Sequence, residues 1–179
     1  VYEGGFKNAR NDGQGVMTYA DGYKYDGSWK DGQRNGTGTA TYPDGTVYTG
    51  GFVDGLRDGT GKITMPAGFT YDGQWSGGEI EGTGTATDPN GDIYEGELQN
   101  GRRHGTGKQT YANGDVFAGD FLDDQRHGMG TFTEKDGYTY TGEWVKGQIE
   151  GKGKAVYPDG SVYEGDFRDD LAEGQGKIT

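Results

Sequence analysis

The chain has 179 residues, with 17 basic against 29 acidic side chains and a net charge of −12. This balance disfavours nucleic acid, whose binding depends on Lys and Arg neutralising phosphates, and simple adsorption to anionic lipid. The absence of cysteine excludes disulfides and cysteine metal sites, and no apolar run reaches the roughly 18 residues of a membrane-spanning helix. No signal or transmembrane segment is recognisable within these residues, and the cellular location is left open.

Large apolar residues recur with a period of 23 residues along the whole chain. The first series is Tyr2, Tyr25, Tyr48, Tyr71, Tyr94, Phe117, Tyr140 and Tyr163. The second series follows four residues after each of these, at Phe6, Trp29, Phe52, Trp75, Leu98, Phe121, Trp144 and Phe167. Of the 39 glycines, 36 fall on five fixed positions of the same period. A fixed period of this length is the signature of a repeat protein, so the function must be that of an array.

Each repeat predicts two strands, as residues 48–70 illustrate. Residues 48–53 and 59–65 both alternate with period 2, which is typical of β-strands. Aromatic residues and glycines share one face of the first strand, and glycines and apolar residues share the same face of the second. We expect each glycine to leave space for an aromatic ring from a neighbouring strand, because a ring can cover glycine backbone that lacks a side chain.

Two kinds of connection join the strands. Successive repeats are joined by turns that combine Pro and Gly, which favour tight hairpins: Pro43-Asp44-Gly45, Pro66-Ala67-Gly68, Pro89-Asn90-Gly91 and Pro158-Asp159-Gly160. Within a repeat we expect a loop of about five residues, such as residues 100–104. No segment has helical periodicity with caps.

The predicted fold is all-β: an elongated single-sheet meander, or solenoid, of antiparallel β-hairpins with essentially no helix. Residues 1–179 form one array of about eight repeats, with starts near residues 2, 25, 48, 71, 94, 117, 140 and 163 and an incomplete last copy. Because neighbouring strands lie about 4.8 Å apart, each repeat should advance roughly 10 Å and the array should measure on the order of 75 Å. Each repeat then contacts only its neighbours.

The pattern Y-x-G-x-[FWL]-x-x-G-x-x-x-G-x-G resembles the MORN repeat (membrane occupation and recognition nexus), with close matches at residues 94–107 and 163–176. Small departures are Ala9, Asp124 and Asp170 at the loop glycine, and Leu98 and Phe117 at the ring positions. The resemblance implies a twisted sheet of hairpins with one shallow groove. It also implies a scaffold that binds protein segments, self-association through terminal repeats in some members, and attachment to lipid kinases or lysine methyltransferases in others.

The aromatic layer is the main candidate binding site. A purely structural role, with rings packed on glycines, accounts for any individual ring. A one-sheet protein should nevertheless leave part of this layer uncovered, and a contiguous exposed apolar strip usually marks an interaction surface. The central members of this predicted groove are Tyr25, Trp29, Tyr48, Phe52, Tyr71, Trp75, Tyr94, Phe121, Tyr140 and Trp144.

A second candidate is a local basic spot on the inner loops, formed by Arg102, Arg103, His104, Arg126 and His127. It could contact phosphate or an acidic peptide, but we favour a solvated edge that pairs with carboxylates such as Asp123 and Asp124. His104 and His127 lie in equivalent loops roughly 10 Å apart, without the further ligands that zinc requires. We therefore predict no metal and no cofactor.

We expect no enzyme within these residues, since the carboxylates recur on exposed loops and no nucleophile–base pattern is present. The predicted function is a non-catalytic scaffold that binds a protein or peptide along its aromatic groove. Self-association through the terminal repeats is a possible addition, since exposed edge strands invite pairing. The alternatives are a targeting or regulatory appendage of a larger enzyme and a peripheral phospholipid-binding module. Membrane contact stays open but is not favoured by the charge.

Overall fold

The computed structural model describes residues 1–179 and contains sixteen β-strands and no helix. The strands belong to two compact units, residues 1–89 and 90–179. The first unit holds β1(Tyr2–Lys7), β2(Arg10–Thr18), β3(Lys24–Lys30), β4(Gln33–Thr41), β5(Val47–Val53), β6(Leu56–Thr64), β7(Thr70–Ser76) and β8(Glu79–Thr87). The second holds β9(Ile93–Gln99), β10(Arg102–Thr110), β11(Val116–Leu122), β12(Gln125–Thr133), β13(Thr139–Val145), β14(Gln148–Val156), β15(Val162–Arg168) and β16(Leu171–Ile178).

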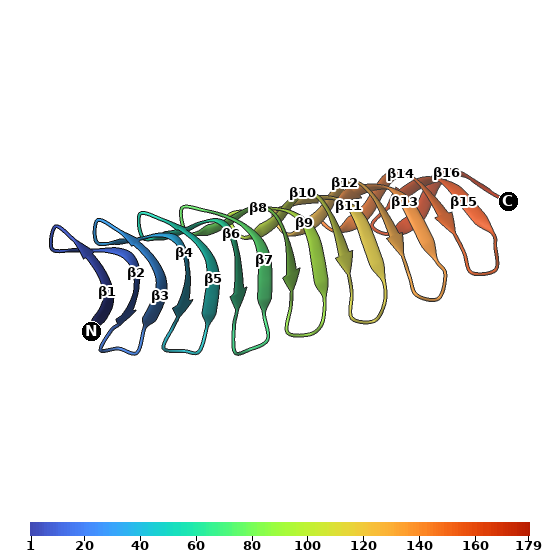
Figure 1. The fold of residues 1–179 in the computed structure, drawn as a ribbon. Coiled ribbons are helices and arrows are strands. Elements are labelled where there is room, and N and C mark those ends of the chain that lie inside the picture. The colour runs from blue at the N-terminus through green and yellow to red at the C-terminus, as the bar shows by residue number, and fades with distance from the viewer. The chain divides into compact units, whose positions relative to one another are not determined.

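Within each unit every strand pairs antiparallel with the next strand in the chain, and each strand is curved along its length (Figure 1). The prediction of an all-β meander of hairpins without helix is therefore confirmed. With no helix in the chain, no element meets the criteria for a membrane-crossing helix.

The turn inside each repeat is shorter than predicted. Strand β9 ends at Gln99 and β10 begins at Arg102, so the turn is Asn100-Gly101 and the expected loop over residues 100–104 is wrong. Asn100 and Gly101 have φ of 50° and 74°, as in the two-residue hairpin turns that match the twist of the flanking strands. The remaining residues of the expected loop are already part of β10.

A bulge follows each of these turns and bends the hairpin. Between β3 and β4 the register passes from Trp29↔Arg34 to Gly27↔Gly38, so β4 has two more residues than β3 in this interval. Gly36 lies inside the bulge with φ of 98°, a backbone conformation that L side chains rarely adopt. This positive φ explains why glycine stands at this position. The extra residues on one strand also curve that strand and increase its twist.

Tyrosine rings lie over glycine backbone, as predicted. A Cβ atom added to Gly38 would lie 2.4 Å from Oη of Tyr25 and 2.5 Å from its Cζ. The same tyrosine also covers Gly27 on its own strand, and its hydroxyl donates to the carbonyl of Ser28 at 3.0 Å. The missing side chains therefore make room for the ring, and the ring in turn buries the backbone.

The second ring of each repeat connects neighbouring repeats. Tyr48 contacts Phe52 of its own repeat and Trp75 of the next, in both cases edge-on with ring centroids 5.2 Å apart. Trp75 also donates from Nε1 to the carbonyl of Gly61 at 2.9 Å. Edge-on aromatic pairs contribute about 1 kcal/mol each beyond the area that they bury. The interior is thus a continuous ladder of rings within each unit.

Candidate functional site

The predicted groove aromatics form the interior of the two units. None of the ten side chains is more than 5% exposed, and Tyr25, Tyr48, Tyr71 and Tyr140 are fully buried. The expectation that this layer remains uncovered is therefore wrong, because the curved strands and the side chains next to each turn close over the rings. A binding role for these aromatics stays a prediction. Of the ten, Trp29 lines a surface depression in the first unit.

An arginine beside each of four hairpin turns lies over the ring layer. The guanidinium carbon of Arg57 is 4.4 Å from the ring centroid of Trp75 in the next repeat, and Nη2 donates to the carbonyl of Gly78 at 2.9 Å. Arg126 stacks on Trp144 at 4.3 Å. These arginines act as clips from one repeat to the next. Their cation–π contacts contribute on the order of 1 kcal/mol each.

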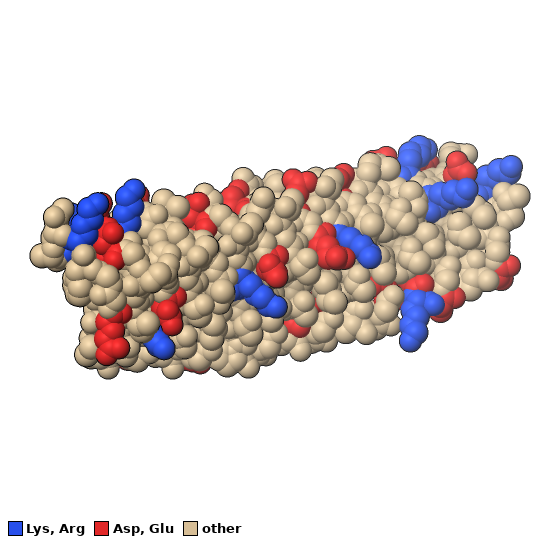
Figure 2. Space-filling model, viewed as in Figure 1, with Lys and Arg blue, Asp and Glu red and all other residues tan.

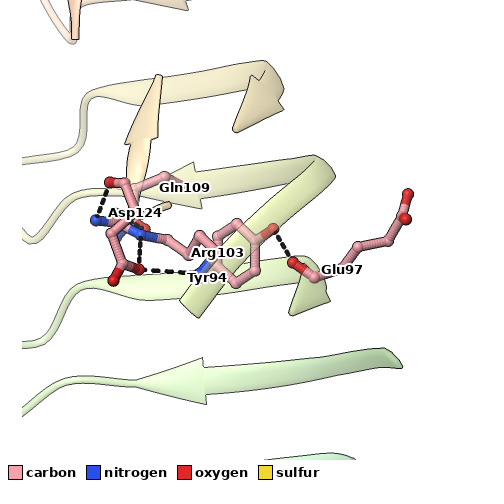
Figure 3. Close-up of polar contacts among 5 residues, drawn as sticks. All are labelled: Tyr94, Glu97, Arg103, Gln109 and Asp124. Atoms are coloured by element: carbon pink, nitrogen blue, oxygen red, sulfur yellow. Dashed lines mark hydrogen bonds and ion pairs between the residues drawn. The ribbon is translucent and has the colours of Figure 1, made fainter. Parts of the chain in front are cut away.

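Arg103 makes the most extensive set of contacts of this kind (Figure 3). Its Nη1 donates to Oε1 of Gln109 at 3.0 Å, Nε lies 3.3 Å from Oδ1 of Asp124, and Nη2 donates to the carbonyl of Asp124 at 2.7 Å. Figure 3 also shows Tyr94 donating from Oη to the carbonyl of Glu97. The predicted pairing with Asp124 is present, but the stacking of these arginines on rings was not foreseen.

The structure does not gather the predicted basic spot into one open surface. Arg102 is exposed, whereas Arg103, His104, Arg126 and His127 are half-buried. Arg103 and Arg126 are engaged with rings in their own unit. The Nδ1 atom of His104 is buried and has no hydrogen-bond partner. No group of three or more His, Cys, Asp or Glu side chains is arranged to hold a metal ion.

A depression of about 450 Å³ opens on the first unit, and sequence reasoning missed it. Tyr19 and Tyr23, which flank the connection between β2 and β3, form one side. The hairpin-turn residues Gly32, Asp54 and Gly55 form the other side. The two ends of the curved strands therefore face each other across Trp29 and Arg34, which also line this space. We call it the tyrosine groove.

Two tyrosines that line the tyrosine groove, Tyr19 and Tyr23, are in tilted ring contact, and Tyr23 also contacts Tyr42 of the next repeat. The ring centroids of Tyr19 and Tyr23 are 5.3 Å apart, and those of Tyr23 and Tyr42 are 5.2 Å apart. Tyr19 is 45% exposed, and the other two are half-buried. Burial is the main cause that raises the pKa of Tyr23, against the nearby Arg34 charge, which lowers it. Tyr23 is therefore neutral at neutral pH, and the three rings together present partly accessible aromatic surface.

Local turn chemistry fixes the position of these rings. The amide of Tyr19 donates to the carbonyl of Tyr23 at 2.9 Å, and the amide of Tyr23 donates to Oδ1 of Asp21 at 2.9 Å. Arg34 donates from Nη1 to Oη of Tyr23 and from Nη2 to the carbonyl of Gly55. The arginine thus links both sides of the tyrosine groove. The available sequence signal was a tyrosine just before the turn, which recurs at Tyr42.

The second unit has only part of this arrangement. Tyr138 and Tyr157, five repeats after Tyr23 and Tyr42, contact each other with centroids 5.6 Å apart. At the position of Tyr19 stands Glu134, and at that of Arg34 stands Ile149. Burial, and then the charges of Asp136 and Asp115, raise the pKa of Glu134. Here a carboxylate replaces one aromatic ring and an aliphatic side chain replaces the cation.

Charged side chains of both signs are interspersed over the face that Figure 2 shows, and the basic side chains there do not form a continuous stripe. Exposed carboxylates of the turns accept local hydrogen bonds, as Asp44 does from the amide of Thr46. This bond and that of the Thr46 hydroxyl lower the pKa of Asp44. The carboxylate of Asp44 is thus ionised at neutral pH.

Strand pairing, glycine-seated rings and turn-to-turn arginine clips define this chain as a β-hairpin repeat protein. The MORN repeat profile matches eight segments, residues 2–22, 25–47, 48–70, 71–93, 94–116, 117–137, 140–162 and 163–179. The chain therefore belongs to the MORN repeat family. A search of curated proteins finds no match.

Solved structures with some similarity include the TCP domain of SAS-4 (dCPAP) from Drosophila melanogaster in complex with a proline-rich motif of Ana2. It is 17% identical, with a TM-score of 0.38, and the match covers 92% of this chain and 87% of that one. The TCP10 domain of Danio rerio CPAP in complex with a STIL peptide is 17% identical, with a TM-score of 0.28, covering 100% and 97%. TM-scores this low carry no argument about function.

Proposed function

We propose that this chain is a non-catalytic repeat scaffold that binds an extended protein segment, and that the tyrosine groove is its principal contact. The observation that carries the proposal is the pair of contacting tyrosines, Tyr19 and Tyr23, which lie beside Arg34 in an open depression of the first unit, with Tyr19 45% exposed. Tyr and Arg are favoured at the energetic centres of protein interfaces. Trp29, which also lines the depression, would be the interior ring that contacts the bound segment.

The shape of the tyrosine groove favours a chain segment over a small molecule. The depression is lined by both ends of the strands, and most of its lining residues are exposed or half-buried. A small-molecule site usually encloses most of its ligand, whereas an extended peptide can lie in an open groove. The acidic turn residues Asp21 and Asp54 in this lining disfavour anionic phospholipid.

Selection from an unbiased peptide library tests this function. The wild-type chain should enrich peptides that share a common motif. Fluorescence polarisation should then show that these peptides bind the chain with similar affinities. Tyr23→Ala should weaken the binding of these peptides by about tenfold, as expected for a central aromatic contact. Tyr138→Ala, at the equivalent position of the second unit, is the matched control and should leave the affinity unchanged.

Two results would count against the proposal. One is a selection in which the chain enriches no peptides beyond those that an unrelated β-sheet protein of similar charge also enriches. The other is equal loss of binding in Tyr23→Ala and Tyr138→Ala, because that would show a general effect on the fold. Circular dichroism melts of both variants separate unfolding from loss of contact.

Self-association through the terminal repeats is a further part of this proposal. Light scattering over a range of protein concentrations measures it directly. A mass that rises above the 19.2 kDa of the single chain would support it, and a constant mass would remove it without affecting peptide binding.

A further inference from the structure

We infer that the tyrosine groove takes an extended peptide of the polyproline type with Lys or Arg at every third residue. This inference rests on the proposed function and names the chemistry of the partner. Three observations support it, namely the charges around the groove, the manner in which Arg34 already occupies part of it, and the spacing of the repeats.

Carboxylates outnumber cations in the lining of the tyrosine groove. Asp21 and Asp54 belong to its lining, on opposite sides, against one cation, Arg34. The equivalent turn residues of the adjoining repeats are also acidic, Asp44 following Asp21 and Asp31 preceding Asp54 by one period. Complementary charge raises the association rate and excludes partners of the wrong sign. The groove therefore favours a cationic segment.

Arg34 shows that a guanidinium group fits against these rings. Its guanidinium carbon is 5.6 Å from the ring centroid of Tyr23 and 5.4 Å from that of Phe52. Both terminal nitrogens donate within the protein, to Tyr23 and to Gly55. The cation of Arg34 is thus already satisfied, while Tyr19 remains 45% exposed. An incoming Lys or Arg can stack on the accessible tyrosine surface, since cations bind to ring faces.

The spacing of the repeats selects the conformation of the partner. Two strands at about 4.8 Å each give roughly 9.6 Å per repeat. A polyproline II helix rises about 9.3 Å per turn of three residues, so every third side chain points the same way at nearly the repeat spacing. In a β-strand, side chains on one face recur at about 6.7 Å, which does not match the repeat. Successive cations of a polyproline segment would therefore meet successive tyrosine-bearing turns.

In the first unit, the connections that combine a tyrosine with an acidic turn residue are the first two. Tyr19 and Tyr23 flank the first connection and Tyr42 the second, both with an acidic turn residue. The third connection carries Met65, Ala67 and Phe69, so it offers an apolar contact without a carboxylate. The expected partner thus places one cation at the first connection and, three residues later, a second cation at the second connection. Apolar residues follow at the third connection.

Fluorescence polarisation with defined peptides tests the inference. The probe is a labelled peptide of repeated Arg-Pro-Pro units, and it is compared with a peptide of the same composition that has its arginines clustered at one end, and with repeated Glu-Pro-Pro. We expect the first to bind about tenfold more tightly than the clustered peptide and the glutamate peptide not to bind. Tighter or equal binding of either control would overturn the inference.

Variants assign the binding to the tyrosine groove. Tyr23→Ala should weaken the Arg-Pro-Pro probe by about tenfold, whereas Tyr23→Phe, which keeps the ring face, should stay within about threefold. The double variant Asp21→Asn with Asp54→Asn should weaken binding and reduce its dependence on salt. Tyr138→Ala in the second unit should bind like the wild type. Equal affinity of wild type and Tyr23→Ala would place the peptide elsewhere and sink the inference.

The outcome also separates this inference from the proposed function. If library-selected peptides bind through Tyr23 but lack cations at every third residue, the partner chemistry is wrong and the scaffold function stands. If no selected peptide depends on Tyr23, the scaffold function at this groove fails as well.

Discussion

The two units have the same kind of interior, but the bulge after each hairpin turn is completed differently in each. In residues 1–89 the side chain that could cap the bulge is absent or short in three of four repeats, at Gly5, Ser28 and Gly51, and only Gln74 caps. In residues 90–179 a carboxylate caps every bulge, from Glu97, Asp120, Glu143 and Asp166. Each accepts the backbone amide nine residues ahead, as Asp120 does from Met129 at 2.9 Å.

Glycine at the uncapped positions has its own physical reason. A Cβ atom at Gly51 would lie 2.1 Å from the carbonyl oxygen of Asp58, and one at Gly5 would lie 2.2 Å from that of Asp12. The partner strand comes too close there for any side chain. The bulge can thus be completed by close backbone approach or by a carboxylate. Rings on glycines are the shared requirement, whereas caps and turn residues are free to vary and therefore to carry function.

Replacement of an interior glycine should have the largest effect and should be equal in both units. A Cβ atom at Gly61 would lie 2.3 Å from Oη of Tyr48, and one at Gly107 would lie 2.4 Å from Oη of Tyr94. Because the rings are held by their neighbours, Gly61→Ala and Gly107→Ala should each lower the free energy of unfolding by about 3 kcal/mol or more. Urea unfolding measures this, with the exposed Thr60→Ala as control. A loss confined to one unit would show that the two interiors are not built alike.

Loss of an arginine clip should cost less and should differ between the units. Arg57→Ala removes stacking on Trp75 and one hydrogen bond, about 1–2 kcal/mol. Arg103→Ala also leaves Oε1 of Gln109 without its donor, and Gln109 is only 2% exposed. An unsatisfied buried acceptor adds about 1–3 kcal/mol. The double variant Arg103→Ala with Gln109→Ala should recover part of this difference, and equal costs for Arg57 and Arg103 would contradict it.

The interior was predictable because the repeat keeps ring and glycine at a fixed register. Tyr48, Gly50 and Gly61 recur at the same positions in each copy, and period-2 alternation was enough to place them on one face. The turn at Asn100-Gly101 carries the Asn-Gly signal of a two-residue hairpin. It was read as a longer loop because the bulge at Gly105 interrupts the alternation that would have marked the start of β10.

The tyrosine groove was not predictable from the repeat pattern. The position of Tyr23 is occupied in later repeats by Thr46, Phe69, Asp92, Asp115, Tyr138 and Ser161, so no period marks it. The sequence alone does not indicate that Arg34 points inward, because charged side chains usually lie in solvent. Its inward direction depends on the register shift at the bulge, which puts it opposite Trp29. Strand curvature then brings the two ends of the strands together, and that is a property of the folded sheet.

The turns offer a smaller contrast between the units. Ala9 and Asp124 both replace the turn glycine and have φ of 61° and 69°. The side chain of Asp124 offsets the strain of this conformation, because its Oδ1 accepts a hydrogen bond from the amide of Arg103 at 2.9 Å. No comparable contact compensates an alanine methyl group, so Ala9→Gly should raise stability by about 1 kcal/mol. Asp124→Gly should fail to stabilise, because it removes the two hydrogen bonds that the Asp124 side chain accepts from Arg103. Thermal melts compare the two, and a stabilising Asp124→Gly would show that strain dominates in both.

Acid should weaken the bulge that Glu97 caps and leave uncapped bulges unchanged, the smallest effect of the four. Hydrogen bonds from the Thr106 hydroxyl and amide hold the pKa of Glu97 below its ordinary value of 4.5. A carboxyl whose pKa is lower in the folded state stabilises the fold above its unfolded pKa, and this contribution is lost as pH falls through the folded pKa. Hydrogen-exchange protection at Thr106 should therefore decrease below about pH 4.5. Thr60, which is two repeats before Thr106 and has Gly51 at the position of the cap, is the uncapped control.

Glu97→Gln isolates the titration from the cap itself. Glutamine keeps an oxygen acceptor, as Gln74 does for the amide of Thr83 at 2.8 Å, but it has no charge to lose. Protection at Thr106 in this variant should stay constant across the same pH range while remaining above that of Glu97→Ala. If Thr106 and Thr60 lose protection together in the wild type, acid acts on the fold as a whole. The carboxylate caps would then not distinguish the second unit from the first.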